Sequence, residues 1–208
     1  MTAPQGGDKQ AFAALIASKL CHDLISPVAA LGNALELLEM DNDADTQAAA
    51  MALIHDGAGQ AARRLRFYRV AFGAAGGSHE IDGREVAEAA TDFVTDAKPD
   101  LDWQVGAEPM PLPQAKMLLN LTALIAEALP RGGTVCVQEL AAGDEAGFEV
   151  KGTGPMVRLS DDYAEVLENM RGPDGAREAG VGLVGLIATQ LGVSLSLNVD
   201  EGSLTIRF

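Results

Sequence analysis

LCHDLISPVAALGNALELL, residues Leu20–Leu38, has the spacing of an amphipathic helix and yet contains a proline. Apolar residues recur at intervals of three and four across residues 8–40. The polar segment Met40–Asp45 predicts a short turn that also supplies capping residues. Helical spacing then resumes through residues 51–68 and ends near the glycine-rich residues 73–78. Two long helices joined by a short loop predict an antiparallel hairpin. The recurring apolar residues of the first helix are Phe12, Ile16, Leu20, Leu24, Leu31, Leu35 and Leu38. Of these, Leu20, Leu24, Leu31 and Leu35 form the predicted buried stripe.

The residues after the glycine-rich segment mix helical and strand patterns. We therefore predict an α+β protein with a helical hairpin over residues 1–76 and a two-layer α/β domain over 77–208. A lone hairpin has too little partner surface to be stable, so its apolar stripe should pack on the second domain or on a second hairpin in a dimeric four-helix bundle. Helices are predicted at 83–97, 113–129, 161–170 and 181–190, and strands at 101–105, 132–140, 146–152 and in a closing hairpin that turns at Asp200–Gly202.

The composition excludes several classes of function. Fifteen basic against thirty acidic residues give a net charge of −15, so no cationic field favours binding to nucleic acid. Cys21 and Cys136 have neither zinc-site spacing nor the pattern of a disulfide framework. The N-terminal residues lack a signal pattern, and no uninterrupted apolar run reaches the ~18 residues that span a bilayer. We expect a cytoplasmic protein without a membrane partner.

His22 lies on the face of the first helix opposite Leu20 and Leu24. Ser26, Ala29, Ala30 and Asn33 share the His22 face, one turn apart. These side chains are small, so an approaching protein surface would meet the imidazole without obstruction.

Pro27 lies five residues after the histidine. It has no N–H, so the carbonyl of Asp23 loses its helical donor, and a proline inside a helix costs ~3 kcal/mol. A kink there would alter how His22 is presented. A proline that bends a long helix and a histidine on a surface are each ordinary features, and only their combination points to a function.

That combination resembles the H-box of two-component histidine kinases. The resemblance implies that His22 accepts a phosphoryl group, that Asp23 hydrogen-bonds the imidazole and raises its nucleophilicity, that Ser26 assists transfer or hydrolysis, and that Pro27 forms the kink. Imidazole is nucleophilic at neutral pH, which agrees with this chemistry.

The two other histidines and one basic cluster differ from this motif. His55 and His79 lack such surroundings, and no metal site is expected. The cluster RRLRFYR (Arg63–Arg69) is either a solvated face that balances nearby acids or a surface that attracts an acidic receiver pocket. On the second interpretation Arg63 and Arg66 are candidate receiver-binding residues.

The second domain resembles the ATP-binding domain of the kinases, but its nucleotide motifs are altered. In the N-box, Asn120 is retained, whereas Leu124 replaces the metal-binding asparagine and Glu127 replaces the lysine. Val150 stands where the adenine-binding aspartate belongs. A glycine-rich loop, GVGLVGL (Gly180–Leu186), keeps only some of its glycines. We therefore expect no ATP and no resident cofactor, and we expect any Mg²⁺ to come from a partner receiver.

A phosphotransfer hairpin joined to a degenerate kinase-like domain resembles the ChpT family of histidine phosphotransferases. The resemblance implies a homodimer that accepts phosphoryl groups from the receiver of a CckA-like hybrid kinase. It also implies CtrA-like and CpdR-like response regulators as acceptors, in cell-cycle control. Three alternatives remain at this point: a divergent ATP-dependent histidine kinase, a noncatalytic module that sequesters response regulators, and an unrelated α/β enzyme.

Overall fold

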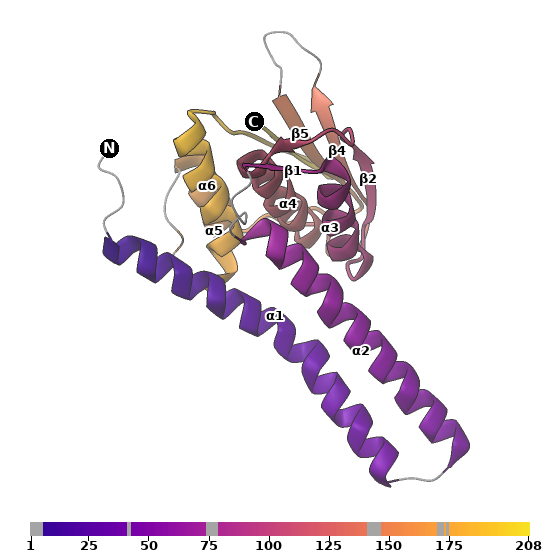
Figure 1. Cartoon of the computed structure of the whole chain (residues 1–208). Coiled ribbons are helices and arrows are strands. Elements are labelled where there is room, and N and C mark those ends of the chain that lie inside the picture. Colours follow the sequence, from indigo (N-terminus) through magenta and orange to yellow (C-terminus); the bar gives the residue numbers. More distant parts are fainter. Residues whose placement is uncertain (1–5, 41–42, 74–78, 141–146, 170–172, 174) are drawn as a thin grey trace.

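Two long helices form a hairpin that extends from the rest of the chain (Figure 1). The computed structural model describes residues 6–40, 43–73, 79–140, 147–169, 173 and 175–208. Helix α1 (Gly6–Met40) and helix α2 (Ala44–Ala71) lie side by side. Asp43 caps α2, because its Oδ2 accepts a hydrogen bond from the Thr46 N–H at 3.1 Å. The predicted hairpin and the capping role of its polar turn are confirmed, although residues 41–42 of that turn lie outside the described part.

The second part of the chain contains a five-stranded sheet in the order β2-β4-β5-β7-β6. Only β2 and β4 pair in parallel. A separate two-stranded antiparallel sheet joins β1 to β3. The strands are β1 (Glu80–Ile81), β2 (Asp100–Gln104), β3 (Met110–Pro111), β4 (Thr134–Leu140), β5 (Gly147–Thr153), β6 (Ser196–Asp200) and β7 (Ser203–Arg207). The helices are α3 (Gly83–Thr95), α4 (Leu112–Glu127), α5 (Asp161–Asn169), the short 3-10 helix η1 (Ala176–Glu178) and α6 (Ala179–Leu191).

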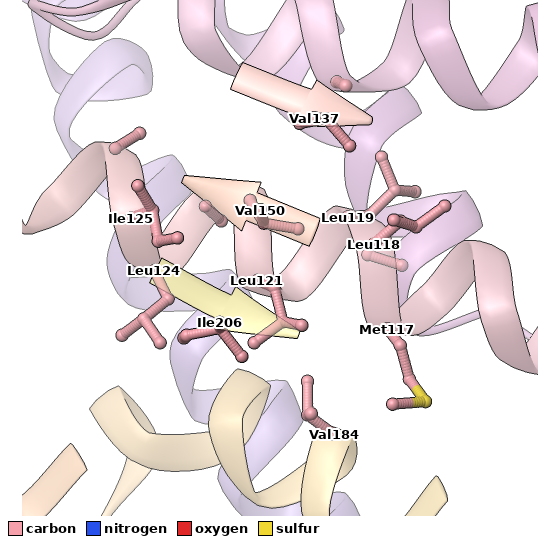
Figure 2. Packing of buried hydrophobic residues seen from close by; sticks show 14 of the residues in the cluster. Met117, Leu118, Leu119, Leu121, Leu124, Ile125, Val137, Val150, Val184 and Ile206 are labelled. Carbon is pink, nitrogen blue, oxygen red and sulfur yellow. The ribbon is translucent and has the colours of Figure 1, made fainter. Parts of the chain in front are cut away.

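Helices cover one face of this sheet and form the second layer (Figure 1). The core lies between the layers, where α4 packs on the inner faces of β4, β5 and β7, and α6 packs on α4 (Figure 2). The outer face is polar, and Arg207 there donates to Glu149 at 2.7 Å. The predicted α+β class and the two-layer domain are confirmed. Buried core residues include Met117, Leu118, Leu119, Leu121, Ile125, Val137, Val150, Val184 and Ile206.

Sequence patterns missed the two short strands and the parallel pair. Strands β1 and β3 have two residues each, too few to show an alternation. Strands β2 and β4 are parallel because α4 lies between them in sequence and crosses over, as parallel strands require. The predicted domain boundary at residues 76–77, the first residue of the strand predicted at 146–152 and the helix end at residue 170 lie outside the described residues.

The contact between α1 and α2 combines small residues with part of the predicted leucine stripe. Leu24 and Leu31 are half-buried, and a Cβ on Gly57 would lie 3.1 Å from Leu31 Cδ2. Pro27 and Ala34 of α1 and Ala50 and Gly57 of α2 are buried. A Cβ on Gly57 would lie 3.1 Å from the Pro27 carbonyl oxygen, so the glycine allows the helices to approach closely. Leu35 is 53% exposed, and its predicted burial is wrong for the single chain. Leu35, together with Ile25 and Val28, leaves apolar surface open on α1.

Helix α1 also bears on the membrane question. Its stretch Gln10–Met40 is long and apolar enough to cross a bilayer by length and composition alone. Charged residues interrupt every apolar run in this stretch, but its mean hydropathy is high because alanine and leucine are spread around the helix. That stretch also contains Lys19, His22 and Asp23.

Candidate functional site

His22 lies near the middle of α1, and its side chain is 73% exposed. Its Nδ1 is 3.0 Å from Asp23 Oδ1. An ionised carboxylate can only accept, so Nδ1 carries the proton in this hydrogen bond. The lone pair is then on Nε2. The structure therefore confirms the contact between the histidine and the neighbouring acid, and the lone pair on the second ring nitrogen is not used in this hydrogen bond.

Asp23 is held on its other oxygen by two donors. The Tyr68 hydroxyl of α2 donates to Oδ2, and Lys19 Nζ lies 3.1 Å from the same atom. Burial alone would raise the pKa of Asp23, but the hydrogen bonds from His22 and Tyr68 and the charge of Lys19 outweigh burial and lower it. The carboxylate that accepts the hydrogen bond from the imidazole is therefore ionised.

The backbone carbonyl of Asp23, which lacks a helical donor because of Pro27, accepts a hydrogen bond from another residue. Arg64 Nη1, from α2, donates to the backbone oxygen of Asp23 at 3.3 Å. Pro27 itself is buried, and α1 continues through it without interruption. The opened turn beside His22 is thus bridged by a side chain from the neighbouring helix.

The second domain reaches the site through α4. Glu127 Oε1 lies 3.8 Å from Lys19 Nζ, and desolvation raises the pKa of Glu127. His22, Lys19, Glu127 and Arg177 line a groove of about 450 Å³ between α1 and the η1 segment. Figure 1 shows α1 passing beside α6, with the far end of the hairpin projecting away. The site therefore lies where the hairpin meets the second domain.

The other residues predicted for the His22 face are all exposed. Ser26, Ala29, Ala30 and Asn33 lie on α1 within three turns of the histidine. The small, open surface that the helical wheel predicts is present. No contact in the structure assigns these four residues a role, so receiver binding by Ala29, Ala30 and Asn33 and assistance by Ser26 stay predictions.

Arg63 and Arg66 both have partners within the chain. Arg63 Nη2 pairs with Asp96 at 2.5 Å, and Arg66 Nε pairs with Asp92 at 2.6 Å. Both acids belong to α3 or its C-terminal cap, so these arginines connect α2 to the second domain. Arg66 remains 55% exposed and Arg63 only 27%. Their contact with a receiver stays a prediction.

The altered nucleotide motifs now serve packing. Asn120 is buried, and its Nδ2 donates to the carbonyl oxygens of Ala71 and Lys116 at 3.3 and 2.9 Å. A Cβ on Gly180 would lie 2.8 Å from Asn120 Oδ1. Leu124 is 4% exposed and Val150 fully buried. A cavity of about 20 Å³ remains between Asn120, Leu124 and Gly180, which is room for roughly one water molecule.

Gly152, two residues after Val150, shows why the glycines remain. A Cβ there would lie 2.5 Å from Ile125 Cγ2, so this glycine lets α4 pack closely on β5. Glycine at this position therefore serves the packing of α4 on the sheet. Across the described residues, no group of three or more His, Cys, Asp or Glu side chains is placed to hold a metal ion.

Lys19, Arg64, Tyr68 and Glu127 were not predicted as site residues. Lys19 had a sequence signal, because it lies one helical turn before Asp23 and can pair with it. Arg64 and Tyr68 lie more than forty residues from Asp23, and Glu127 more than a hundred from Lys19. Only the tertiary structure brings them together.

Comparisons with known proteins agree in sequence and in fold. The sequence profile of the histidine phosphotransferase C-terminal domain matches residues 83–203. The protein phosphotransferase ChpT of Brucella abortus (strain 2308) is 38% identical over 154 residues, which are 74% of this chain and 72% of that protein.

Among solved structures, a bacterial phosphotransferase determined at 1.7 Å superposes with a TM-score of 0.84 at 30% identity. The superposition covers 100% of this chain and 98% of the other. The histidine kinase AdeS of Acinetobacter baumannii matches with a TM-score of 0.45 at 14% identity, over 90% of this chain and 96% of the kinase.

Proposed function

The chain belongs to the ChpT-type family of histidine phosphotransferases, and we propose that His22 is the residue that carries the phosphoryl group in a bacterial phosphorelay. The donor is the phosphorylated aspartate of a hybrid-kinase receiver of the CckA type. The acceptors are aspartates of CtrA-like and CpdR-like response regulators that control the cell cycle. The observation that carries this proposal is the exposed His22 with its Nδ1 bonded to Asp23.

The chemistry follows from that hydrogen bond. The Nε2 lone pair attacks the phosphorus of the receiver's aspartyl phosphate and forms an N–P bond. The P–O bond to the aspartate breaks, and its electron pair leaves with the receiver's carboxylate. Positive charge develops on the ring during attack, and the ionised Asp23 stabilises it through Nδ1–H. A second receiver's carboxylate later attacks the same phosphorus and reverses the sequence.

Receivers are proposed to dock on the His22 face, with Ala29, Ala30 and Asn33 as contacts and with Ser26 assisting transfer. The exposure of all four supports this surface. Arg66 is the better of the two arginine candidates, because its guanidinium is more than half exposed while it pairs with Asp92. The groove beside His22 adds Arg177 from the second domain as a cation within reach of an acidic partner.

We propose a homodimer in which two hairpins form a four-helix bundle. Each helix leaves an apolar stripe exposed at helical spacing: Ile25, Val28 and Leu35 on α1, and Met51, Ala58, Ala62 and Leu65 on α2. Unpartnered apolar faces of this length are typical of interfaces. The same burial accounts for the apolar character of α1 in a cytoplasmic protein.

The relay is proposed to use no ATP. The side-chain amide of Asn120 already donates hydrogen bonds to the carbonyls of Ala71 and Lys116. The buried aliphatic side chains of Val150 and Leu124 replace the carboxylate and the amide that would hold adenine and magnesium. Magnesium enters with the receiver, whose aspartate pocket binds it.

Transfer of labelled phosphate tests the function. Wild type and His22→Ala are offered either a ³²P-labelled receiver domain or labelled ATP with Mg²⁺, and His55→Ala is the control because His55 is an exposed histidine on α2. We expect acid-labile label from the receiver alone in wild type and His55→Ala, and none in His22→Ala. Label from ATP alone would instead establish a divergent kinase. Receiver binding without label in any variant would establish a noncatalytic binding module.

A further inference from the structure

The two oxygens of the Asp23 carboxylate have different partners. Oδ1 accepts from His22 Nδ1, whereas Oδ2 accepts from the Tyr68 hydroxyl and contacts Lys19 Nζ. The terminal torsion of an aspartate is broad and roughly two-fold, so a carboxylate held on one oxygen alone can rotate or exchange its oxygens. With Oδ2 held by two donors, Oδ1 stays directed at the imidazole.

Tyr68 is suited to this role by its own surroundings. Its ring is 2% exposed and packs against Phe67 and Phe72, with centroids 5.5 and 5.7 Å away. A buried phenol needs an acceptor for its hydroxyl, and Asp23 supplies it. Burial and the adjacent carboxylate raise the pKa of Tyr68, so the hydroxyl remains a donor throughout the working pH range.

We infer that Tyr68 is a positioning residue for phosphoryl transfer, which fixes Asp23 so that His22 keeps its proton on Nδ1 and its lone pair on Nε2. The inference rests on the proposed function of His22. Tyr68 does not touch the phosphoryl group, and it acts through Asp23. Lys19 shares the task, so loss of Tyr68 alone weakens the arrangement without abolishing it.

Tyr68→Phe tests this role, because it removes the hydroxyl and retains the packed ring. Hydrogen bonds to charged groups are among the stronger ones in proteins, so we expect transfer from a ³²P-labelled receiver domain to slow about tenfold. A second measurement reports the tautomer: ¹⁵N NMR of histidine-labelled full-length protein at alkaline pH, with the His22 signals assigned by their loss in His22→Gln. We expect part of the His22 population to move from the Nδ1–H to the Nε2–H form.

Thr122→Val is the matched control, because it also removes a fully buried hydroxyl, one that donates to the Leu118 carbonyl within α4. We expect wild-type transfer and a wild-type tautomer there. Slower transfer in Tyr68→Phe with an unchanged tautomer would overturn the inference, because the loss would then be structural. An altered tautomer with unchanged transfer, or no change in either, would overturn it as well. Failure of the wild type to accept label would instead remove the proposed function itself.

Discussion

Replacing Arg64 with methionine should destabilise the protein, and the size of the loss should depend on Pro27. Arg64 Nη1 donates to the Asp23 carbonyl oxygen that the proline leaves without its helical donor. Methionine keeps much of the aliphatic stem, so the change removes mainly the guanidinium. A hydrogen bond from a charged donor contributes ~1.5–3 kcal/mol.

Two observations place the expected cost at the low end of that range. The 3.3 Å contact is slightly longer than the usual N–H···O distance. Arg64 Nε is also buried without a partner among the described residues, so its removal relieves a small cost. We therefore expect a loss of ~1.5 kcal/mol, which for a chain of this length lowers Tm by roughly 3–6 °C.

Pro27→Ala supplies the decisive background for this prediction. Alanine restores an N–H at position 27 that can donate to the Asp23 carbonyl, so Arg64→Met should then cost under ~0.5 kcal/mol. Urea unfolding of the four proteins, followed by circular dichroism at one fixed protein concentration, measures the coupling. Independent sites add within ~0.3–0.5 kcal/mol. An equal loss in both backgrounds would refute the reasoning, because Arg64 would then not be replacing the donor that Pro27 lacks.

Three further outcomes are expected. Wild type should sediment as the proposed dimer, and Leu35→Asp or Leu65→Asp should convert it to a monomer in sedimentation velocity, since each places a charge on an exposed apolar stripe. A dimer that both variants leave unchanged would place the interface elsewhere. Arg63→Met should lower the free energy of unfolding in urea by ~2 kcal/mol, because it leaves the buried carboxylate of Asp96 unpaired. Arg66→Met should leave stability nearly unchanged, because its pair with Asp92 is exposed. Slower phosphoryl transfer in Arg66→Met would therefore report a contact with the receiver. The pKa of Asp23 lies below its ordinary value of 3.8, so its ionised form stabilises the fold above that pH and the contribution disappears as the pH falls. Asp23→Asn should therefore reduce the free energy of unfolding at neutral pH but change it little in acid. Equal losses at both pH values would contradict this assignment.

The hairpin could be predicted because its information is local. Period and turn chemistry indicate both helices, and Asp43 caps α2 as its sequence position predicts. The face of α1 that meets α2 could be predicted only in part, since Leu31 lies there but Leu35 is exposed and Ala34 is buried instead. Which side chains are buried depends on how closely the two helix backbones approach at Gly57. A hydropathy pattern carries no information about that distance.

The site divides in the same way. His22 and Asp23 are neighbours in sequence, so the resemblance to the H-box anticipates their hydrogen bond. Tyr68 and Glu127 reach the site only after α2 and α4 have packed. From the sequence, Glu127 indicates only that the N-box lysine used in nucleotide binding has been replaced. Its contact with Lys19 depends on the docking of two domains, for which sequence has no signal.

The fastening of α4 to the end of α2 by Asn120 has a kinetic consequence. A protein that phosphorylated its own histidine from a nucleotide would have to bring one domain to the other in every cycle. If His22 receives phosphoryl groups only from receivers, as proposed, no such movement is needed, because His22 faces solvent in a structure whose two parts are in contact. Phosphoryl traffic should then be second order throughout, with a rate that rises in proportion to receiver concentration. The rate would be set by diffusional association with receivers and by the residence time of each bound receiver. The cell could therefore set the direction of phosphoryl transfer by changing the concentrations of its receivers.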